Sequence, residues 1–274
     1  MRSDGPNGRA IVVVACVLGA IAVVFALAAV ALVLASGADH SRLEALSTGV
    51  VSLVFVAAGL AAWLALPSSR VGPLLTAAGF AWIAGGLDES PVPLVYAAGE
   101  LLRPLFIPLA VHALLGFPAG RLRRLADRAA ALLLYVAVLV LGPARFLVSP
   151  EPNDDCGDCA RNPLAVIDDH ALLELLSGAQ QVAVAAGVAG AALILARRWL
   201  VASRVGAHEV APALAAAACA IAYLLALGGE QLIDPSDEVE DVLALIQIVA
   251  ASAVPVLLLV GIRRARAAAT PAGR

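Results

Sequence analysis

The sequence predicts an all-α fold: a polytopic membrane bundle of about eight transmembrane helices with both termini in the cytoplasm. Only 14% of its 274 residues are charged and its mean hydropathy is +0.94, whereas soluble domains carry about 25% charged residues. The apolar residues come in blocks of about twenty, the length that crosses a ~30 Å hydrocarbon core. Because no water satisfies backbone groups there, each block should be helical.

Eight apolar blocks set the boundaries of the predicted spans. They lie at residues 10–36, 48–66, 71–87, 94–117, 129–148, 171–196, 210–228 and 242–262. The third block is short and rich in glycine. The first exceeds the roughly 7–15 apolar residues of a cleaved signal peptide, so we expect it to stay as a span. The predicted organisation is one membrane domain at 10–262, with cytoplasmic tails at 1–9 and 263–274.

The arginines set the expected orientation, because cytoplasmic loops of membrane proteins carry an excess of basic residues. All 18 basic residues are arginine, and 14 of them fall inside if the N-terminus is inside. These are Arg2, Arg9, Arg70, Arg121, Arg123, Arg124, Arg128, Arg197, Arg198, Arg204, Arg263, Arg264, Arg266 and Arg274. Most acidic residues between spans fall on the other side. We therefore expect a multi-pass protein of the cell membrane.

The inside segment "PAGRLRRLADR" (118–128) predicts a short basic helix at the membrane surface. Its leucines would enter the headgroup layer beside anionic lipids, although the segment is equally typical of a simple positive-inside anchor. The residues expected to contact lipid, or to couple to a cytoplasmic partner, are Arg121, Arg123, Arg124, Arg128, Arg197 and Arg198.

The fourth span, "AAGELLRPLFIPLAVHALLGF", is the most polar. Glu100 and Arg103 are three residues apart and should neutralise each other. Pro104 and Pro108 each remove a helix hydrogen bond and are candidate hinges. His112 lies on a face about 180° from Arg103. These side chains indicate either a ligand pocket or hinge, or a satisfied polar cluster between helices.

Other polar or helix-bending residues lie in later spans. Gln180, Gln181 and Gln247 are candidates for the same intramembrane cluster, although such residues more often form bonds between helices. Pro255 is a third candidate hinge in the last span. Small-residue runs such as "GVAGAA" favour close helix packing and are compatible with a homodimer.

The longest outside loop, 149–170, contains "DDCGDCARNP" with Cys156 and Cys159. On the outside, thiols tend to oxidise, so a small disulfide ring is the leading interpretation. A redox-sensing pair, a zinc site with His170 and free thiols stay open. His170 and Glu174 lie one turn apart, but an incomplete ligand set is a poor zinc motif. We therefore predict no metal and no cofactor.

Four short patterns lie at the ends of predicted spans: "PSSRVGPLLTAAGFAW" (67–82), "LLGFPAGRL" (114–122), "CGDCARNPLAV" (156–166) and "VPVLLLVGIRRARAA" (254–268). In this order they resemble the N-terminal membrane region of sensor histidine kinases of GC-rich bacteria, the class that partners LuxR-type response regulators. Ser69, Pro73 and Ala160 depart from that family's usual Asn, Trp and Pro.

The resemblance implies the sensor half alone. Kinases of this class continue into a helical pair with the phosphoacceptor histidine and then an ATP-binding domain, whereas this sequence ends at "TPAGR". We expect a non-catalytic sensory or regulatory module that works with a separate kinase or response regulator. No Walker A or Rossmann glycine pattern is present, and no nucleic-acid partner is expected. A small-molecule transporter or channel using the fourth span, and a thiol-redox or intramembrane enzyme using the cysteine loop, are the alternatives.

Overall fold

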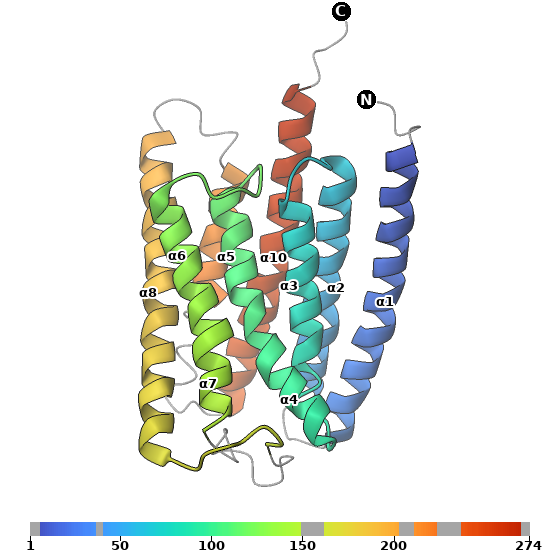
Figure 1. The fold of residues 1–274 in the computed structure, drawn as a ribbon. Coiled ribbons are helices and arrows are strands. Elements are labelled where there is room, and N and C mark those ends of the chain that lie inside the picture. The colour runs from blue at the N-terminus through green and yellow to red at the C-terminus, as the bar shows by residue number, and fades with distance from the viewer. Residues whose placement is uncertain (1–5, 37–40, 149–161, 203–210, 224–236, 270–274) are drawn as a thin grey trace, which may run out of the picture.

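The computed structural model describes residues 6–36, 41–148, 162–202, 211–223 and 237–269, and all elements within these ranges are helices (Figure 1). The undivided long helices are α1 (Pro6–Ser36), α2 (Ser41–Ala65), α8 (His170–Ala202) and α10 (Asp237–Ala269). Two shorter ones are α3 (Val71–Gly85) and the helix Ala211–Tyr223. The fourth predicted span is divided into α4 (Pro93–Leu102), η1 (Arg103–Leu105) and α5 (Phe106–Gly116). The fifth is divided into α6 (Leu125–Val136), η2 (Ala137–Leu141) and α7 (Gly142–Phe146).

Each of the eight predicted segments therefore contains a helix among the described residues, although end residues such as Leu66, Leu87 and Phe117 lie beyond the helix ends. Among the residues that the structure describes, six helices are long and apolar enough to cross a membrane: Arg9–Ala35, Arg42–Ala65, Pro93–Gly116, Leu125–Phe146, His170–Arg198 and Val239–Ala267. The helices Val71–Gly85 and Ala211–Tyr223 are shorter. At 1.5 Å per residue, α3 is about 22 Å long, less than a ~30 Å hydrocarbon core. Six candidate spans are thus shown where the sequence predicts eight.

Several helices extend beyond the predicted apolar blocks. α2 begins at Ser41 and includes Glu44, and α10 runs from Asp237 to Ala269, well past the predicted 242–262. The reason is physical: hydropathy marks only the part of a helix that suits hydrocarbon, whereas backbone hydrogen bonds continue the helix into the polar layer. Helix extensions at either end of the bundle are therefore underestimated by an apolar-block rule.

The glycine-rich α3 lies at the centre of the bundle. It packs against α1, α2, α4 and α5, and ten of its fifteen residues are buried. Gly59 of α2 and Gly72 of α3 face each other, because a Cβ on either one would come within 2.8 Å of the other's carbonyl oxygen. Small residues let membrane helices approach this closely. The glycines that make this segment an untypical membrane span therefore allow a helix to pack closely against its neighbours on several sides.

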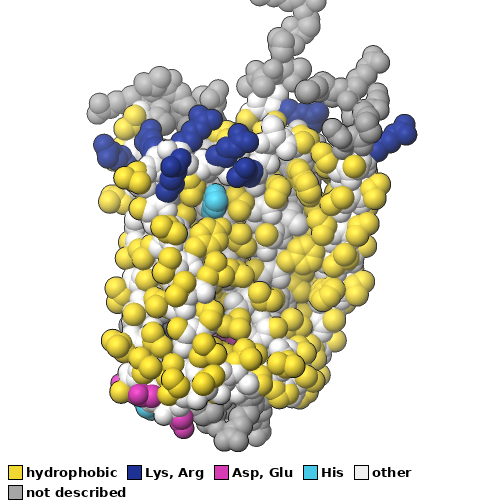
Figure 2. Space-filling view, viewed as in Figure 1, with side chains coloured by type: hydrophobic (Ala, Val, Ile, Leu, Met, Phe, Trp, Pro, Cys, Tyr) yellow, Lys and Arg dark blue, Asp and Glu magenta, His cyan; other side chains and the backbone are white. Residues whose placement is uncertain are grey.

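Charge separates the two ends of the bundle. α1 begins and α10 ends at the same end, and Figure 2 shows the arginines gathered there and acidic side chains at the opposite end. We call these the basic end and the acidic end. By the bounds of the helices, the first includes Arg70, Arg121, Arg123, Arg124 and Arg197, and the second includes Asp88, Glu89, Asp168, Asp169 and Glu174. The surface between them is largely hydrophobic (Figure 2).

Candidate functional site

Two of the patterns identified in the sequence meet at the basic end. The backbone N–H of Arg70, before α3, donates to the carbonyl of Ala119, after α5, at 3.0 Å. The hydroxyl of Ser69 donates to the carbonyl of Pro118 at 2.6 Å and accepts from the N–H of Val71 at 3.2 Å. The segments "PSSRVGP" and "GFPAGRL" therefore form one junction that joins the α2–α3 and α5–α6 connections.

Gly120 allows this junction to close. Its φ is +69°, a left-handed conformation that favours glycine. A Cβ on Gly120 would lie 2.6 Å from the carbonyl carbon of Arg70 and from the nitrogen of Val71. Its N–H donates to the carbonyl of Gly116 at 2.7 Å and so ends α5. The glycine of the "PAGR" pattern is thus required by its backbone conformation and by the close approach of Arg70 and Val71.

A buried ion pair lies beside the junction. Arg198 Nη2 of α8 lies 2.6 Å from Asp127 Oδ2 of α6, and Arg198 Nη1 donates to the carbonyl of Leu115 of α5 at 2.7 Å. The Asp127 side chain is 3% exposed and that of Arg198 is 24% exposed. Asp127 Oδ1 is buried without a hydrogen-bond partner among the described residues. One guanidinium therefore holds three helices together, and Asp127 depends on it for neutralisation.

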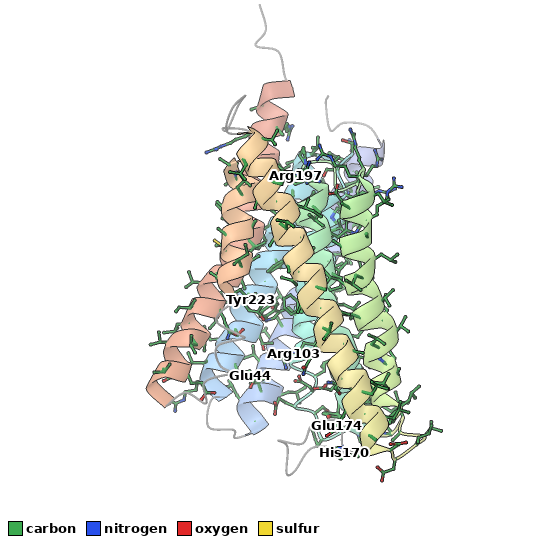
Figure 3. All side chains as sticks on the ribbon, turned by 90° about the vertical axis from the view of Figure 1, so that its left-hand side faces the viewer. Glu44, Arg103, His170, Glu174, Arg197 and Tyr223 are labelled. Atoms are coloured by element: carbon green, nitrogen blue, oxygen red, sulfur yellow. The ribbon has the colours of Figure 1, made fainter. Side chains whose placement is uncertain are left out.

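The same region contains a cleft of about 880 Å³, which we call the arginine cleft. It lies between the α5–α6 connection, the start of α6, the end of α8 and the helix Ala211–Tyr223. Its charged lining consists of Arg121, Arg123, Arg124, Asp127, Arg197 and Arg198. Figure 3 shows Arg197 at the basic end of α8. Five of the six arginines predicted for lipid contact or coupling thus share one cleft, whereas Arg128 is turned aside and donates to the carbonyl of Leu122 at 3.0 Å.

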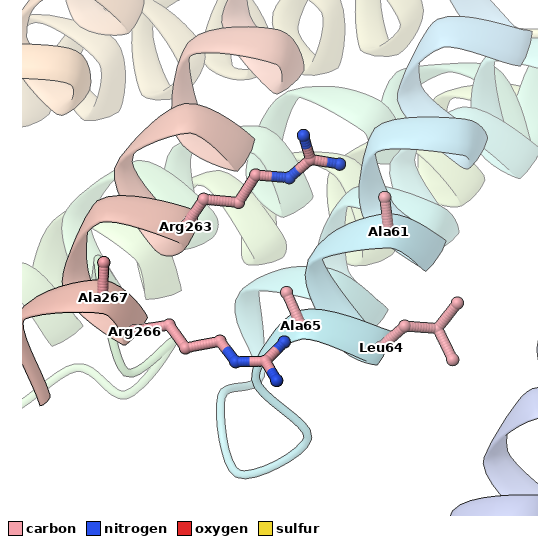
Figure 4. A pocket seen from close by; sticks show the side chains of 6 residues that line it. All are labelled: Ala61, Leu64, Ala65, Arg263, Arg266 and Ala267. Carbon is pink, nitrogen blue, oxygen red and sulfur yellow. The ribbon is translucent and has the colours of Figure 1, made fainter. Parts of the chain in front are cut away.

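A second, smaller cleft lies between α2 and α10 at the same end. It has a volume of about 560 Å³, and Figure 4 shows Arg263 and Arg266 of α10 opposite Ala61, Leu64 and Ala65 of α2. The α2 side of this cleft is lined by apolar side chains, and the α10 side carries its two arginines.

At the acidic end, Arg103 forms an ion pair that the sequence did not indicate. Its Nη1 lies 2.8 Å from Oδ2 of Asp88, which is 8% exposed in the turn after α3. Glu44 and Glu100 are also close enough to act on Asp88 electrostatically. Burial raises the pKa of Asp88 to about 6, and the Arg103 charge opposes that shift. Figure 3 shows Arg103 and Glu44 in the same half of the bundle.

The remaining predicted polar residues do not join this cluster. His112 lies nine residues, or roughly 14 Å, further along the helix, where its Nδ1 is 3.3 Å from the Tyr135 hydroxyl. Gln180 of α8 lies near Gly142, 3.5 Å from where a Cβ on that glycine would be. Gln181 is exposed, and Gln247 of α10 has a buried Nε2 without a hydrogen-bond partner among the described residues. The candidate cluster is therefore distributed over different places in the bundle.

An aromatic group lies next to Arg103. Trp82 of α3, Phe106 of α5 and Tyr223 have ring centroids 4.5 to 5.9 Å apart. Tyr223 lies on the basic-end side of Arg103 in Figure 3, and Phe106 follows Arg103 by three residues. Such ring contacts pack tightly and bury a large area.

Two helices are broken at neighbouring points. Pro104 lies in the 3₁₀ segment η1, where it has no N–H to continue the α-helical pattern. In the other helix, Pro143 follows the π-helical segment η2, in which the N–H of Gly142 donates to the carbonyl of Ala137. η1 and η2 contact each other. The helix is broken at Pro104, one of the three candidate hinges, whereas Pro108 and Pro255 lie within continuous helices. That any of them acts as a hinge stays a prediction.

Of the loop 149–170, the structure describes only the last part, from residue 162. Asn162 is buried; its Nδ2 donates to the carbonyl of Phe146, and its Oδ1 accepts from the N–H of Leu164 at 2.9 Å. This anchors the "RNPL" part of the third pattern to the end of α7. Cys156 and Cys159 lie outside the described residues, and the disulfide, redox and zinc alternatives stay predictions.

The described residues add little to the metal hypothesis. His170 Nδ1 and Glu174 Oε1 are 3.6 Å apart, and both side chains are 73% exposed. Among the residues that the structure describes, no group of three or more metal-ligating side chains is found. Cys16 and Cys219, in α1 and the helix Ala211–Tyr223, are free.

Comparison with known proteins gives no relative: no family model, curated protein or solved structure matches this chain.

Proposed function

We propose that the chain is a non-catalytic sensory or regulatory module of the cell membrane, similar to the input region of a two-component sensor histidine kinase. In this proposal eight helices cross the membrane, and the basic end faces the cytoplasm. The segregation of arginines at the end where α1 begins and α10 ends supports that orientation.

The observation that carries the proposal is the course of α10. It is a single helix of 33 residues, Asp237–Ala269, that extends beyond its neighbours at the basic end (Figure 1). Its inner face packs against α2, with Val254, Leu258 and Ile262 buried. Because a packed helix moves as a unit, a change at the acidic end can displace the arginines at its other end. This is the mechanical property that a membrane input region needs.

Cross-linking at the end of α10 tests the proposal. A photo-reactive amino acid replaces exposed Ala267, and a control variant carries it at Leu34, which is exposed at the opposite end of α1. In native membranes we expect a kinase or response regulator to be captured at position 267 and not at position 34. If neither protein is captured at position 267 above the level of the control, the sensory proposal fails.

Orientation is tested separately by labelling. In a cysteine-free background, a cysteine replaces exposed Ser68 at the basic end or exposed Asp168 at the acidic end. A membrane-impermeant maleimide applied to intact cells should label position 168 and not position 68. Labelling of position 68 alone would invert the proposed topology.

A transporter is the second candidate, and the contact between η1 and η2 favours it. Broken helices that meet inside a bundle form substrate sites in many secondary transporters, and Arg103 begins η1. Proteoliposomes should then show substrate-dependent flux that is lost in Arg103→Ala. Absence of flux across a panel of charged and neutral solutes would favour the sensory role.

A further inference from the structure

We propose that the arginine cleft binds the phosphate-bearing headgroup of an anionic phospholipid, with the start of the acyl chain against its apolar wall. This inference does not depend on the proposed sensory role, because it rests on the lining of one cleft. At about 880 Å³, the cleft is within the size range of small-molecule sites in proteins.

Charge in the cleft favours a multiply contacted anion. Five arginines and one aspartate line it, so the net formal charge of its side chains is +4. Arg198 is already paired with Asp127, whereas Arg121, Arg123, Arg124 and Arg197 form no ion pair with any residue that the structure describes. Guanidinium groups bind phosphate oxygens in a bidentate manner. Four such groups from two separate segments converge on one space.

The Arg198–Asp127 ion pair holds the α8 side of the arginine cleft in place. Arg198 is held by Asp127 Oδ2 and the Leu115 carbonyl, which positions the end of α8 against α5 and α6. Arg197, the next residue, is exposed and lines the cleft. The buried pair therefore sets where Arg197 stands relative to the arginines of the α5–α6 connection.

The apolar part of the lining favours a lipid over a free phosphate ester. It includes Leu114, Leu115, Phe117, Ile194, Val201 and Leu214. These side chains come from the ends of membrane helices, next to the exposed apolar surface of α8 at Leu193 and Leu200. A charged rim above an apolar wall matches an amphiphile that enters from the bilayer, and basic pockets between membrane helices bind anionic headgroups in this way.

Other arginines at the basic end lie outside the cleft, so the site differs from a uniform basic belt. Arg128 bonds to the Leu122 carbonyl, and Arg9 and Arg264 are exposed on other helices. Arg9 and Arg264 provide a matched control. The double variant Arg9→Gln/Arg264→Gln removes two positive charges from the basic end, as Arg123→Gln/Arg124→Gln does, but leaves the cleft unchanged.

Native mass spectrometry of the full chain tests the proposal. The protein in detergent is mixed with equal amounts of phosphatidylglycerol and phosphatidylcholine, and bound lipid is counted for wild type and both double variants. We expect preferential retention of phosphatidylglycerol by wild type, about 20-fold weaker retention in Arg123→Gln/Arg124→Gln, and little change in the control pair. Arg197→Gln, from the other side of the cleft, should weaken retention by about fivefold.

Two results would overturn the proposal. Equal losses in the cleft variant and the control pair would show a diffuse basic belt without a site. In a parallel arm, glycerol 3-phosphate and inorganic phosphate compete with the lipid; if either binds as tightly as phosphatidylglycerol, the ligand is a soluble phosphate and the lipid assignment is wrong. Melting temperatures of all variants are compared first, and Arg197→Gln replaces the double variant if the latter does not fold.

Discussion

The Arg198–Asp127 pair gives an asymmetric prediction about stability. Arg198→Ala leaves the Asp127 carboxylate, 3% exposed, without its cation and with both oxygens unpaired. Asp127→Ala leaves a guanidinium that is 24% exposed, still bonds to the Leu115 carbonyl at 2.7 Å and faces the arginine cleft. The two partners are therefore unequal in what they lose.

The magnitudes follow from that difference in burial. Removing the partner of a buried charge costs about 3–5 kcal/mol, and this is our estimate for Arg198→Ala. For Asp127→Ala we expect about 1–3 kcal/mol, because the freed arginine keeps one hydrogen bond and can extend toward water. The double variant should cost less than the sum of the single variants by about 2 kcal/mol, since contacting residues are not additive.

Unfolding in mixed micelles, followed by tryptophan fluorescence, measures these free energies. Arg197→Ala is the control, because Arg197 is adjacent, exposed and in no ion pair with a described residue; its effect should stay within about 0.5 kcal/mol. If Asp127→Ala costs as much as Arg198→Ala, the argument from their unequal burial is wrong. If the effects of the single variants simply add, the pair does not carry the stabilisation assigned to it.

Three further predictions concern single positions. Gly120→Ala should lower the free energy of unfolding by at least about 2 kcal/mol, because φ is +69° and the new Cβ would meet backbone atoms. The control Gly178→Ala, where a Cβ would have nothing within 4 Å, should raise it by about 0.5–1 kcal/mol. The melting temperatures of both variants test this difference. Ser69→Ala should cost about 1–2 kcal/mol and Ser69→Asn much less, because Asn can also donate and accept; unfolding in mixed micelles measures both. Asp88 has a pKa raised to about 6 from 3.8, so its contribution to stability is complete below about pH 4 and is lost as pH rises through 6; Asp88→Asn should flatten the melting temperature between pH 4 and 7.

The sequence located the helices well because apolar length and helix-breaking residues are local properties. All eight predicted segments coincide with described helices, and Pro104 marks a real break. The π-helical segment before Pro143 was not predicted, because its form depends on how the chain accommodates a missing N–H. Local rules thus locate irregular points without specifying their hydrogen bonds.

Pairing between charged residues was predicted less well. The i,i+3 rule relates Glu100 to Arg103, but it does not identify the partner that the structure gives Arg103 in Asp88, 15 residues earlier. Likewise, Arg198 pairs with Asp127 across 71 residues. Such partners depend on how helices rotate against each other, which spacing along one helix does not encode. The one available signal was an isolated acid, Asp127, within the basic segment "GRLRRLADR".

The sequence patterns that carry the resemblance to sensor kinases include residues that join helices through the backbone. Ser69 and Gly120 serve backbone geometry: one hydroxyl bonds to the Pro118 carbonyl and the Val71 N–H, and the glycine has no Cβ to meet Arg70. Asn162 likewise bonds backbone groups at the other end. A shared set of such patterns therefore indicates a shared way of joining helices and carries no information about a stimulus. Under the proposed sensory role, specificity for a stimulus is expected in side chains outside the patterns. The Asp88–Arg103 pair, in which Asp88 is 8% exposed and Arg103 54% exposed, is a charged candidate next to the broken helix.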